Sequence, residues 1–254
     1  MRGKRGYGTL LPINPPGSAD AERSLSPWAG ALALSDGMKK TIVYIDGYNL
    51  YYGLLKGTPY KWLDPVSFAR ALLRDEHEIL AVKYFTANIK TYPHDQEAVE
   101  RQNVYLQALT HLDKLHMVYG FYRKSNVLMP AINEKCKICD QLEGRCIRVV
   151  KLEEKKSDVN LAVSLMVDAT QSGADCFAVV TGDSDQAGAI EAMRYHYGKT
   201  VLVFNPHVGE SVHLKKAASY YRNIPRDLPA RCQLPDTVPV GTHGNRIHRP
   251  PAWS

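Results

Sequence analysis

Long apolar runs are missing from this chain of 254 residues. No stretch approaches the roughly 20 consecutive apolar residues that a membrane-spanning helix needs. The only apolar stretch near the first residue, residues 28–34, is short and starts too late for the layout of a secretory signal. The sequence therefore predicts no association with a membrane.

Cysteine is also scarce. An odd number of unevenly spaced cysteines makes a poor disulfide framework, and the chain has five: Cys136, Cys139, Cys146, Cys176 and Cys232. Free thiols are typical of a reducing compartment. We therefore expect a cytoplasmic protein.

Two common phosphate-handling signatures are absent. There is no glycine-rich loop of the G-x-x-x-x-G-K-[ST] type, which disfavours a P-loop enzyme. The first apolar strand is not followed by a D-x-D-x-[TV] motif, which argues against one class of small phosphohydrolase.

Acidic residues are outnumbered by basic ones: the net charge is +6 and the pI about 9.0. A basic surplus favours polyanionic partners such as nucleic acid.

The two ends differ in composition from the middle. Residues 1–37 are rich in proline and show no sustained periodicity, which predicts a disordered extension or an upstream start assignment, with Met38 as the natural start. Residues 223–254 are rich in Pro and Arg and predict a second disordered segment. One domain is expected over residues 38–222, with a cysteine-bearing insert at residues 130–147.

Within this domain, apolar β-branched runs alternate with segments of helical spacing. The expected strands are residues 41–45, 79–86, 115–122, 176–181 and 200–204, and the expected helices are residues 64–74, 95–112, 158–169, 186–197 and 212–221. Such alternation predicts an α/β fold with a mostly parallel central sheet covered by helices on both faces.

Four acidic residues fall at the ends of these elements. Asp46, Asp183 and Asp185 directly follow expected strands, and Asp158 opens an expected helix. Ligands bind at the carboxyl ends of parallel strands, so the first three should share one rim. Asp158 joins them only if residues 148–152 form a parallel strand of the sheet. Clustered carboxylates repel one another unless a cation is present, and oxygen ligands suit Mg²⁺ or Mn²⁺.

Each acid also has a purely local explanation. Asp183 suits the N-cap of the following helix, Asp158 the positive end of a helix dipole, and Asp46 a turn before Gly47. Three acids at two strand ends are harder to explain by local roles alone.

Three motifs together resemble the NYN domain family, a PIN-like group close to the LabA-like proteins. They are "VYIDGYNLYYG", "EEKKSDVNLAVSLMVDA" and "VVTGDSDQAGAIEAMRYHYGKTVLVFNP", and the resemblance spans residues 39–221. It implies a PIN-like three-layer α/β/α sandwich and Mg²⁺- or Mn²⁺-dependent hydrolysis of RNA phosphodiester bonds.

The resemblance also implies roles for individual residues. Asp46, Asp158 and Asp183 match principal metal ligands, Asp185 matches a ligand or water-orienting group, and Asn49 would position substrate or water. PIN-like domains often pair, which implies a homodimer. The chain departs from the family pattern after the last acid, where Gln186 and Gly188 stand near the start of the helix.

The insert suggests a second metal. Cys136, Cys139 and Cys146 form a C-x-x-C pair with a third thiol, which fits a structural zinc site if a fourth ligand such as His111 or His116 joins them. The alternative is three reduced surface thiols.

Two functional hypotheses follow. The first is a divalent-metal-dependent ribonuclease, an endoribonuclease by resemblance. The second is a non-catalytic module of the same fold that binds RNA or a nucleotide. Loss of cleavage on removing the metal distinguishes them.

Overall fold

The computed structural model describes residues 37–90, 96–130, 146–240 and 245–253. The expected extension at residues 1–37 lies, except for Gly37, outside the described residues, and so do Cys136 and Cys139. No helix among the described residues is long and apolar enough to cross a membrane.

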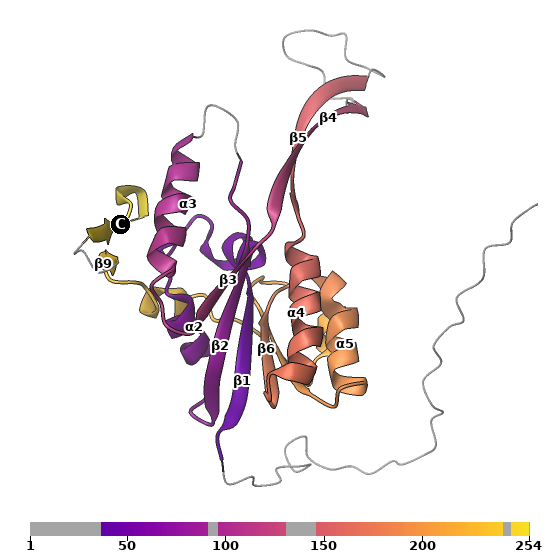
Figure 1. Cartoon of the computed structure of the whole chain (residues 1–254). Coiled ribbons are helices and arrows are strands. Elements are labelled where there is room, and N and C mark those ends of the chain that lie inside the picture. The colour runs from indigo at the N-terminus through magenta and orange to yellow at the C-terminus, as the bar shows by residue number, and fades with distance from the viewer. Residues whose placement is uncertain (1–36, 91–95, 131–145, 241–244, 254) are drawn as a thin grey trace, which may run out of the picture. The chain divides into compact units, whose positions relative to one another are not determined.

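A six-stranded parallel sheet forms the centre of the domain (Figure 1). In spatial order its strands are β3 (Leu115–Tyr119), β2 (His77–Thr86), β1 (Lys39–Asp46), β6 (Cys176–Val180), β7 (Thr200–Asn205) and β8 (Tyr220–Asn223). The fold is a three-layer α/β/α sandwich, which confirms the predicted PIN-like class.

The central strands are apolar along their whole length because both faces are covered. Alternate side chains of a strand point to opposite faces. In β1, Val43 and Ile45 pack in the cluster that contains α2 (Pro65–Leu72), whereas Ile42 and Tyr44 pack in the cluster that contains α4 (Ser157–Gln171), α5 (Ala187–Tyr195) and α6 (Val212–Ala217). One strand thus contributes to both cores of the sandwich.

Most helices lie close to the expected positions: α2 (Pro65–Leu72), α3 (Gln96–Leu109), α4 (Ser157–Gln171), α5 (Ala187–Tyr195) and α6 (Val212–Ala217). Helix α1 (Gly47–Leu50) and the π-helical turn η1 (Tyr51–Leu55) after β1 were not predicted from the sequence, and a 3₁₀ turn η3 (Ser184–Gln186) precedes α5. The expectation of one helix over residues 212–221 was wrong at its end. The chain leaves the helix at Ala218 and returns as β8, the edge strand paired with β7.

A two-stranded antiparallel ribbon corrects two further expectations. Strand β3 ends at Tyr119, and β4 (Phe121–Pro130) pairs with β5 (Cys146–Lys155) outside the central sheet, from which the ribbon extends (Figure 1). Residues 148–152 are therefore not a parallel strand of the sheet. Gly120 permits the break between β3 and β4, because a Cβ there would lie 2.5 Å from the Lys155 carbonyl oxygen.

The ribbon bears on the zinc prediction. Cys146 is the first residue of β5 and pairs with Pro130 at the far end of the ribbon. The C-x-x-C pair falls in residues 131–145, outside the described residues. The zinc site therefore stays a prediction.

The C-terminal segment is folded, so the expectation of a disordered tail at residues 223–254 was wrong. A 3₁₀ turn η4 (Leu228–Arg231) is followed by β9 (Thr237–Val240), β10 (Asn245–His248) and a last turn η5 (Pro251–Trp253), with β9 and β10 antiparallel. Leu228, Leu234 and Val238 are buried, and Trp62 is fully buried beneath this segment with Leu234 and Val238 in its cluster.

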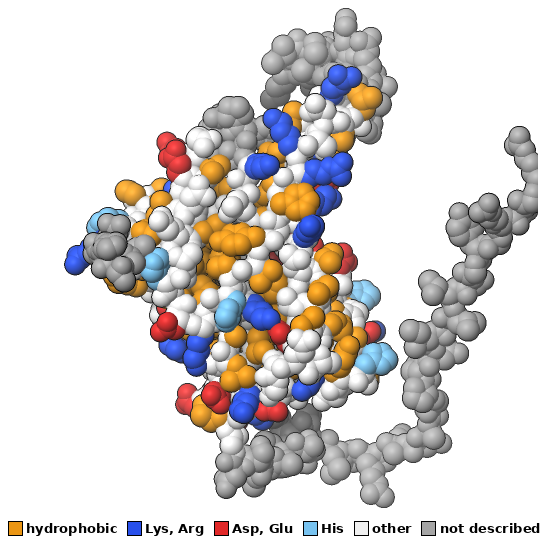
Figure 2. All heavy atoms as spheres, in the orientation of Figure 1, with side chains coloured by type: hydrophobic (Ala, Val, Ile, Leu, Met, Phe, Trp, Pro, Cys, Tyr) orange, Lys and Arg blue, Asp and Glu red, His pale blue; other side chains and the backbone are white. Residues whose placement is uncertain are grey.

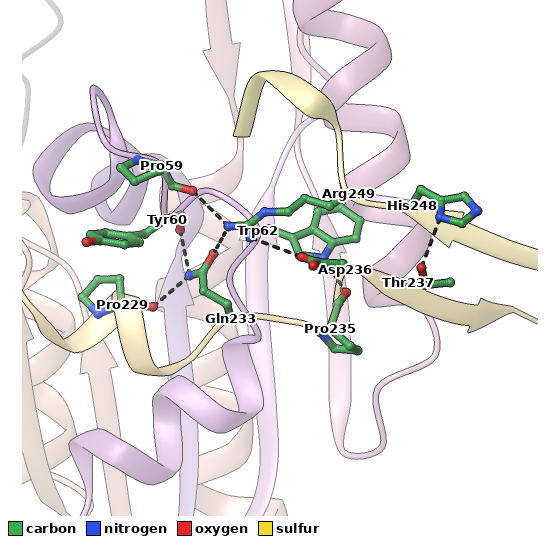
Figure 3. A network of polar contacts seen from close by, with 10 residues as sticks. All are labelled: Pro59, Tyr60, Trp62, Pro229, Gln233, Pro235, Asp236, Thr237, His248 and Arg249. Atoms are coloured by element: carbon green, nitrogen blue, oxygen red, sulfur yellow. Dashed lines mark hydrogen bonds and ion pairs between the residues drawn. The ribbon is translucent and has the colours of Figure 1, made fainter. Parts of the chain in front are cut away.

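Hydrogen bonds also hold this C-terminal segment against the rest of the domain (Figure 3). The Trp62 indole donates to the Pro235 carbonyl at 2.9 Å, and the Arg249 guanidinium donates to the Pro59 carbonyl at 3.2 Å and to the Gln233 amide oxygen at 3.1 Å. These proline and arginine residues are ordered by long-range contacts. Composition alone does not reveal such contacts.

Candidate functional site

Two neighbouring strands bring acidic residues to one edge of the sheet. Asp46 is the last residue of β1, while Asp183 and Asp185 follow the end of β6. Strands β1 and β6 are adjacent and in register up to Ile45 and Val180. The acids therefore lie on the carboxyl edge of the parallel sheet.

Asp46 is buried and held by three hydrogen bonds. Its Oδ1 accepts from the backbone N–H of Asn49 at 2.9 Å, and its Oδ2 accepts from the Asn49 side-chain amide at 2.7 Å and the Thr181 hydroxyl at 3.2 Å. The first of these bonds caps helix α1. Burial raises the pKa of Asp46 in spite of these bonds, with the Asp183 charge adding to the effect.

Asn49 links three strand ends. Besides donating to Asp46, its Oδ1 accepts from the Gly182 N–H at 3.2 Å and contacts His207 Nε2 at 3.1 Å, a contact in which the ring nitrogen carries the hydrogen. Its amide is thus engaged with the residues after β1, β6 and β7. This arrangement makes Asn49 a positioning residue for Asp46.

His207 was not among the predicted site residues. It follows β7, and the signal available in the sequence was its place just past an expected strand that neighbours β6. Gly182 is required beside it, because a Cβ on Gly182 would run into the His207 ring and lie 2.6 Å from Asn205 Oδ1. The close packing leaves this part of the site no room for a larger residue.

Asp183 and Asp185 form a tight turn. Asp183 Oδ1 accepts from the Asp185 N–H at 3.0 Å, and the Asp183 N–H donates to the Thr181 hydroxyl at 3.1 Å. Asp183 therefore acts as the N-cap of the 3₁₀ turn, and Asp185 is exposed. Asp183 therefore both caps this turn and lies on the rim with the other acids.

Asp158 reaches the rim by a different route from the expected one. The chain arrives along β5, turns at Lys156 with φ of 80°, and starts α4 at Ser157. The Gln186 amide donates to the Asp158 carbonyl at 3.1 Å, which ties the start of α4 to the turn after β6. Gln186, the unexpected residue of the motif, is therefore a structural link.

The electrostatics of Asp158 show that it shares the field of the other acids. Partial loss of hydration and then the charges of Asp46, Asp183, Glu154 and Asp185 raise its pKa to about 6. Glu154 was missed by sequence reasoning. Glu154 Oε1 accepts hydrogen bonds from the Ser157 N–H at 3.1 Å and from the Ser157 hydroxyl at 2.6 Å. Glu154 therefore lies close to Asp158 at the base of the ribbon.

Carboxylate oxygens are the donors that a hard divalent cation prefers, and several of them gather at this rim. No three His, Cys, Asp or Glu side chains among the described residues are close enough together to hold a metal ion by themselves. The predicted acids Asp46, Asp158, Asp183 and Asp185 form no ion pair within the same part of the chain. Mg²⁺ commonly uses one or two carboxylates and keeps several waters.

We expect Asp158→Asn to stabilise the metal-free protein above pH 6. The pKa of Asp158, about 6 when folded and 3.8 ordinarily, means that its ionisation destabilises the fold as pH rises through this range. Because the carboxylate is exposed and screened, the gain is about 1 kcal/mol or less, a rise of about 2–4 °C in Tm. Melting curves in EDTA at pH 5 and pH 8 measure the difference in Tm between the variant and the parent. An equal difference at both pH values would contradict the prediction.

The chain matches one family model and is similar to two known proteins. The NYN domain matches residues 40–225. A protein of Pseudomonas putida named 6-hydroxy-3-succinoylpyridine 3-monooxygenase HspA is 33% identical over 223 residues, which cover 79% of this chain and 72% of the relative. A solved protein of unknown function from Vibrio parahaemolyticus is a distant likeness, with a TM-score of 0.43 and 17% identity over 76% of this chain and 97% of that one.

The family match spans the sheet, the acids of the rim and the ribbon between them. Its bounds agree with the span of the three sequence motifs. The chain belongs to the NYN domain family.

Proposed function

We propose that this protein is a divalent-metal-dependent ribonuclease that hydrolyses RNA phosphodiester bonds at the rim acids. The observation that carries the proposal is the gathering of acids at one rim, where partial burial first, and then the charges of Asp46, Asp183, Glu154 and Asp185, raise the pKa of Asp158 to about 6. A bound Mg²⁺ or Mn²⁺ would supply neutralisation of the phosphate and activation of water. Asp46, Asp158 and Asp183 would hold it, with Asp185 as a ligand or water-orienting group.

The ribbon supports RNA as the substrate. Lys and Arg side chains gather along it in Figure 2; those on its strands are Arg123, Lys124, Arg148, Lys151 and Lys155, and Lys156 follows directly after β5. Lys151 and Lys155 pair with Glu153, whereas Arg123, Lys124 and Arg148 form no ion pair with the described residues. Arg123 and Lys124 near the base of the ribbon and Arg148 toward its far end offer unpaired cations to a phosphate backbone.

Labelled single-stranded RNA tests the proposal. We expect cleavage products with Mn²⁺ or Mg²⁺ and none in excess EDTA, with activity restored when the metal is added back. Internal and end labels on the same RNA separate endonucleolytic from exonucleolytic cleavage. Retention of the full rate in EDTA would contradict the proposal.

A non-catalytic RNA- or nucleotide-binding module is the second candidate. It is favoured by the local roles that the acids also fill, since Asp46 and Asp183 both cap turns. This function predicts RNA retention that weakens with salt and yields no products even with Mn²⁺. A filter-binding assay run beside the cleavage assay distinguishes the two.

The relative's name raises a third reaction class for the same region. A cavity lined by six tyrosines adjoins Asp46, and a pyridine ring would fit among them. Oxygen uptake that depends on 6-hydroxy-3-succinoylpyridine and an electron donor would favour this class over RNA hydrolysis. We place either activity in the cytoplasm, since Cys176 and Cys232, the cysteines whose side chains the structure describes, are both free thiols. A homodimer stays a prediction.

A further inference from the structure

A cavity of 590 Å³ lies beside the residues that follow Asp46. Its volume is in the range of sites that take a small molecule or one nucleotide. Gly47 and Tyr48 belong to its wall, so it begins immediately after the last residue of β1. Its aromatic lining consists of Tyr48, Tyr51, Tyr52, Tyr84, Tyr105, Tyr122 and Trp253.

The charge of the cavity has one sign. Lys61, Lys90 and Arg101 line it, and among the described residues no Asp or Glu does. Arg101 pairs with Glu97 at 3.0 Å, while Lys61 and Lys90 form no ion pair with the described part of the chain. Two ammonium groups are therefore available at the wall of an aromatic cavity.

The inner wall is held in place by its own hydrogen bonds. The Tyr48 hydroxyl donates to the Ala87 carbonyl at 2.8 Å, and the Tyr105 hydroxyl donates to the Leu63 carbonyl at 2.9 Å. The rings of Tyr48 and Tyr122 meet edge to face at 6.0 Å. A wall fixed in this way loses little entropy when a ligand enters.

We propose that this cavity is a binding site for a planar aromatic ring that carries an anionic group. The tyrosine and tryptophan faces offer stacking, and Lys61 and Lys90 offer charge to a phosphate or carboxylate. Each base stacked on an aromatic side chain contributes substantially to affinity, and the contribution depends little on the base. Tyr52, 58% exposed, stands at the open side, where an entering ring meets it.

Two sources can supply such a ligand. One is a nucleotide of an RNA chain, whose neighbouring phosphate would then lie near Asp46. The other is a free aromatic acid of low molecular weight. Binding in this cavity does not require cleavage at the rim acids, so each can fail without the other.

Calorimetry on the full chain in EDTA tests the site. The probes are uridine 5′-monophosphate and pyridine-3-carboxylate, with uridine and inorganic phosphate as the two halves of the first probe. We expect saturable binding of at least one intact probe and weaker binding of each half. Tyr52→Ala and Lys90→Ala should each weaken it about tenfold, and Tyr52→Phe should restore it.

Matched variants control for general effects. Tyr195→Ala and Lys216→Ala remove exposed side chains of the same types outside the cavity and should leave affinity unchanged. Binding of the mononucleotide identifies an RNA unit as the source, and binding of the carboxylate alone identifies a small aromatic acid. The inference is overturned if neither probe binds, or if Tyr52→Ala and Lys90→Ala bind as tightly as the parent protein.

Discussion

Asp46→Asn is expected to lower RNA cleavage by about 10²–10³-fold while the protein stays folded. The carboxylate sits at the end of β1 with only 2% of its surface exposed, and the charge of Asp183 reaches it across the rim. The substitution removes one negative charge and changes the shape of the side chain very little. A metal that depends on this charge would bind more weakly, and the cleavage rate would fall with it.

The fold should tolerate the change. Asparagine keeps an oxygen acceptor for the Asn49 N–H that caps α1, and it removes a charge whose burial raises the pKa of Asp46. Because a buried carboxylate is costly to ionise, the neutral residue offsets the loss of a hydrogen bond from Asn49 or Thr181. We expect the Tm to stay within a few degrees of that of the parent.

Asp175→Asn is the matched control. Asp175 is exposed and precedes β6, at the opposite end of that strand from Asp183. It should retain the parent rate, whereas Asp183→Asn should lose activity as Asp46→Asn does. Cleavage by both Asp46→Asn and Asp183→Asn at the parent rate would remove the case for a nuclease and leave the fold unaffected.

The parts of this site that could be predicted follow from the sheet. Buried parallel strands are continuous apolar runs, so β1 and β6 are recognisable in the sequence, and the residues after them must lie at the carboxyl edge. The positions of Asp46 and Asp183 need no further information. His207 obeys the same rule but was passed over, because a single histidine after a strand carries no pattern.

The other parts depend on pairing that the sequence does not encode locally. The alternation in β5 is compatible with any partner strand, and only the register from Phe121–Lys155 to Pro130–Cys146 shows that it pairs with β4. Asp158 therefore reaches the rim by way of the ribbon, and the parallel strand that was expected to bring it there, over residues 148–152, was wrong. Glu154 comes with it, two residues before the left-handed Lys156.

Removing residues 225–254 is expected to destabilise the domain by several kcal/mol. Leu228, Leu234 and Val238 are each 4–5% exposed, and burial of one such side chain contributes about 1.5–3 kcal/mol. The deletion also uncovers Trp62, which is fully buried. Release of the chain's conformational entropy offsets part of this loss, but native domains are stable by only about 5–15 kcal/mol.

A point variant separates packing from chain length. Leu234→Ala leaves the whole segment in place and creates a cavity against Trp62, at an expected cost of about 2–5 kcal/mol, or a fall of about 5–15 °C in Tm. Val208→Ala, at a position 80% exposed, should change the stability by no more than about 0.5 kcal/mol. Thermal denaturation of the three proteins measures the difference.

A disordered tail and a packed segment give opposite results here. If residues 225–254 were a tail, the shortened protein would melt at the same temperature as the parent. If they pack as the contacts of Trp62 and Arg249 require, the shortened protein is unfolded or has a much lower Tm.

Trp253 connects this segment to the tyrosine-lined cavity, because Trp253 forms part of the cavity wall and its ring lies 6.3 Å from that of Trp62. A shortened protein that still folds should therefore have lost the ligand affinity expected of the cavity.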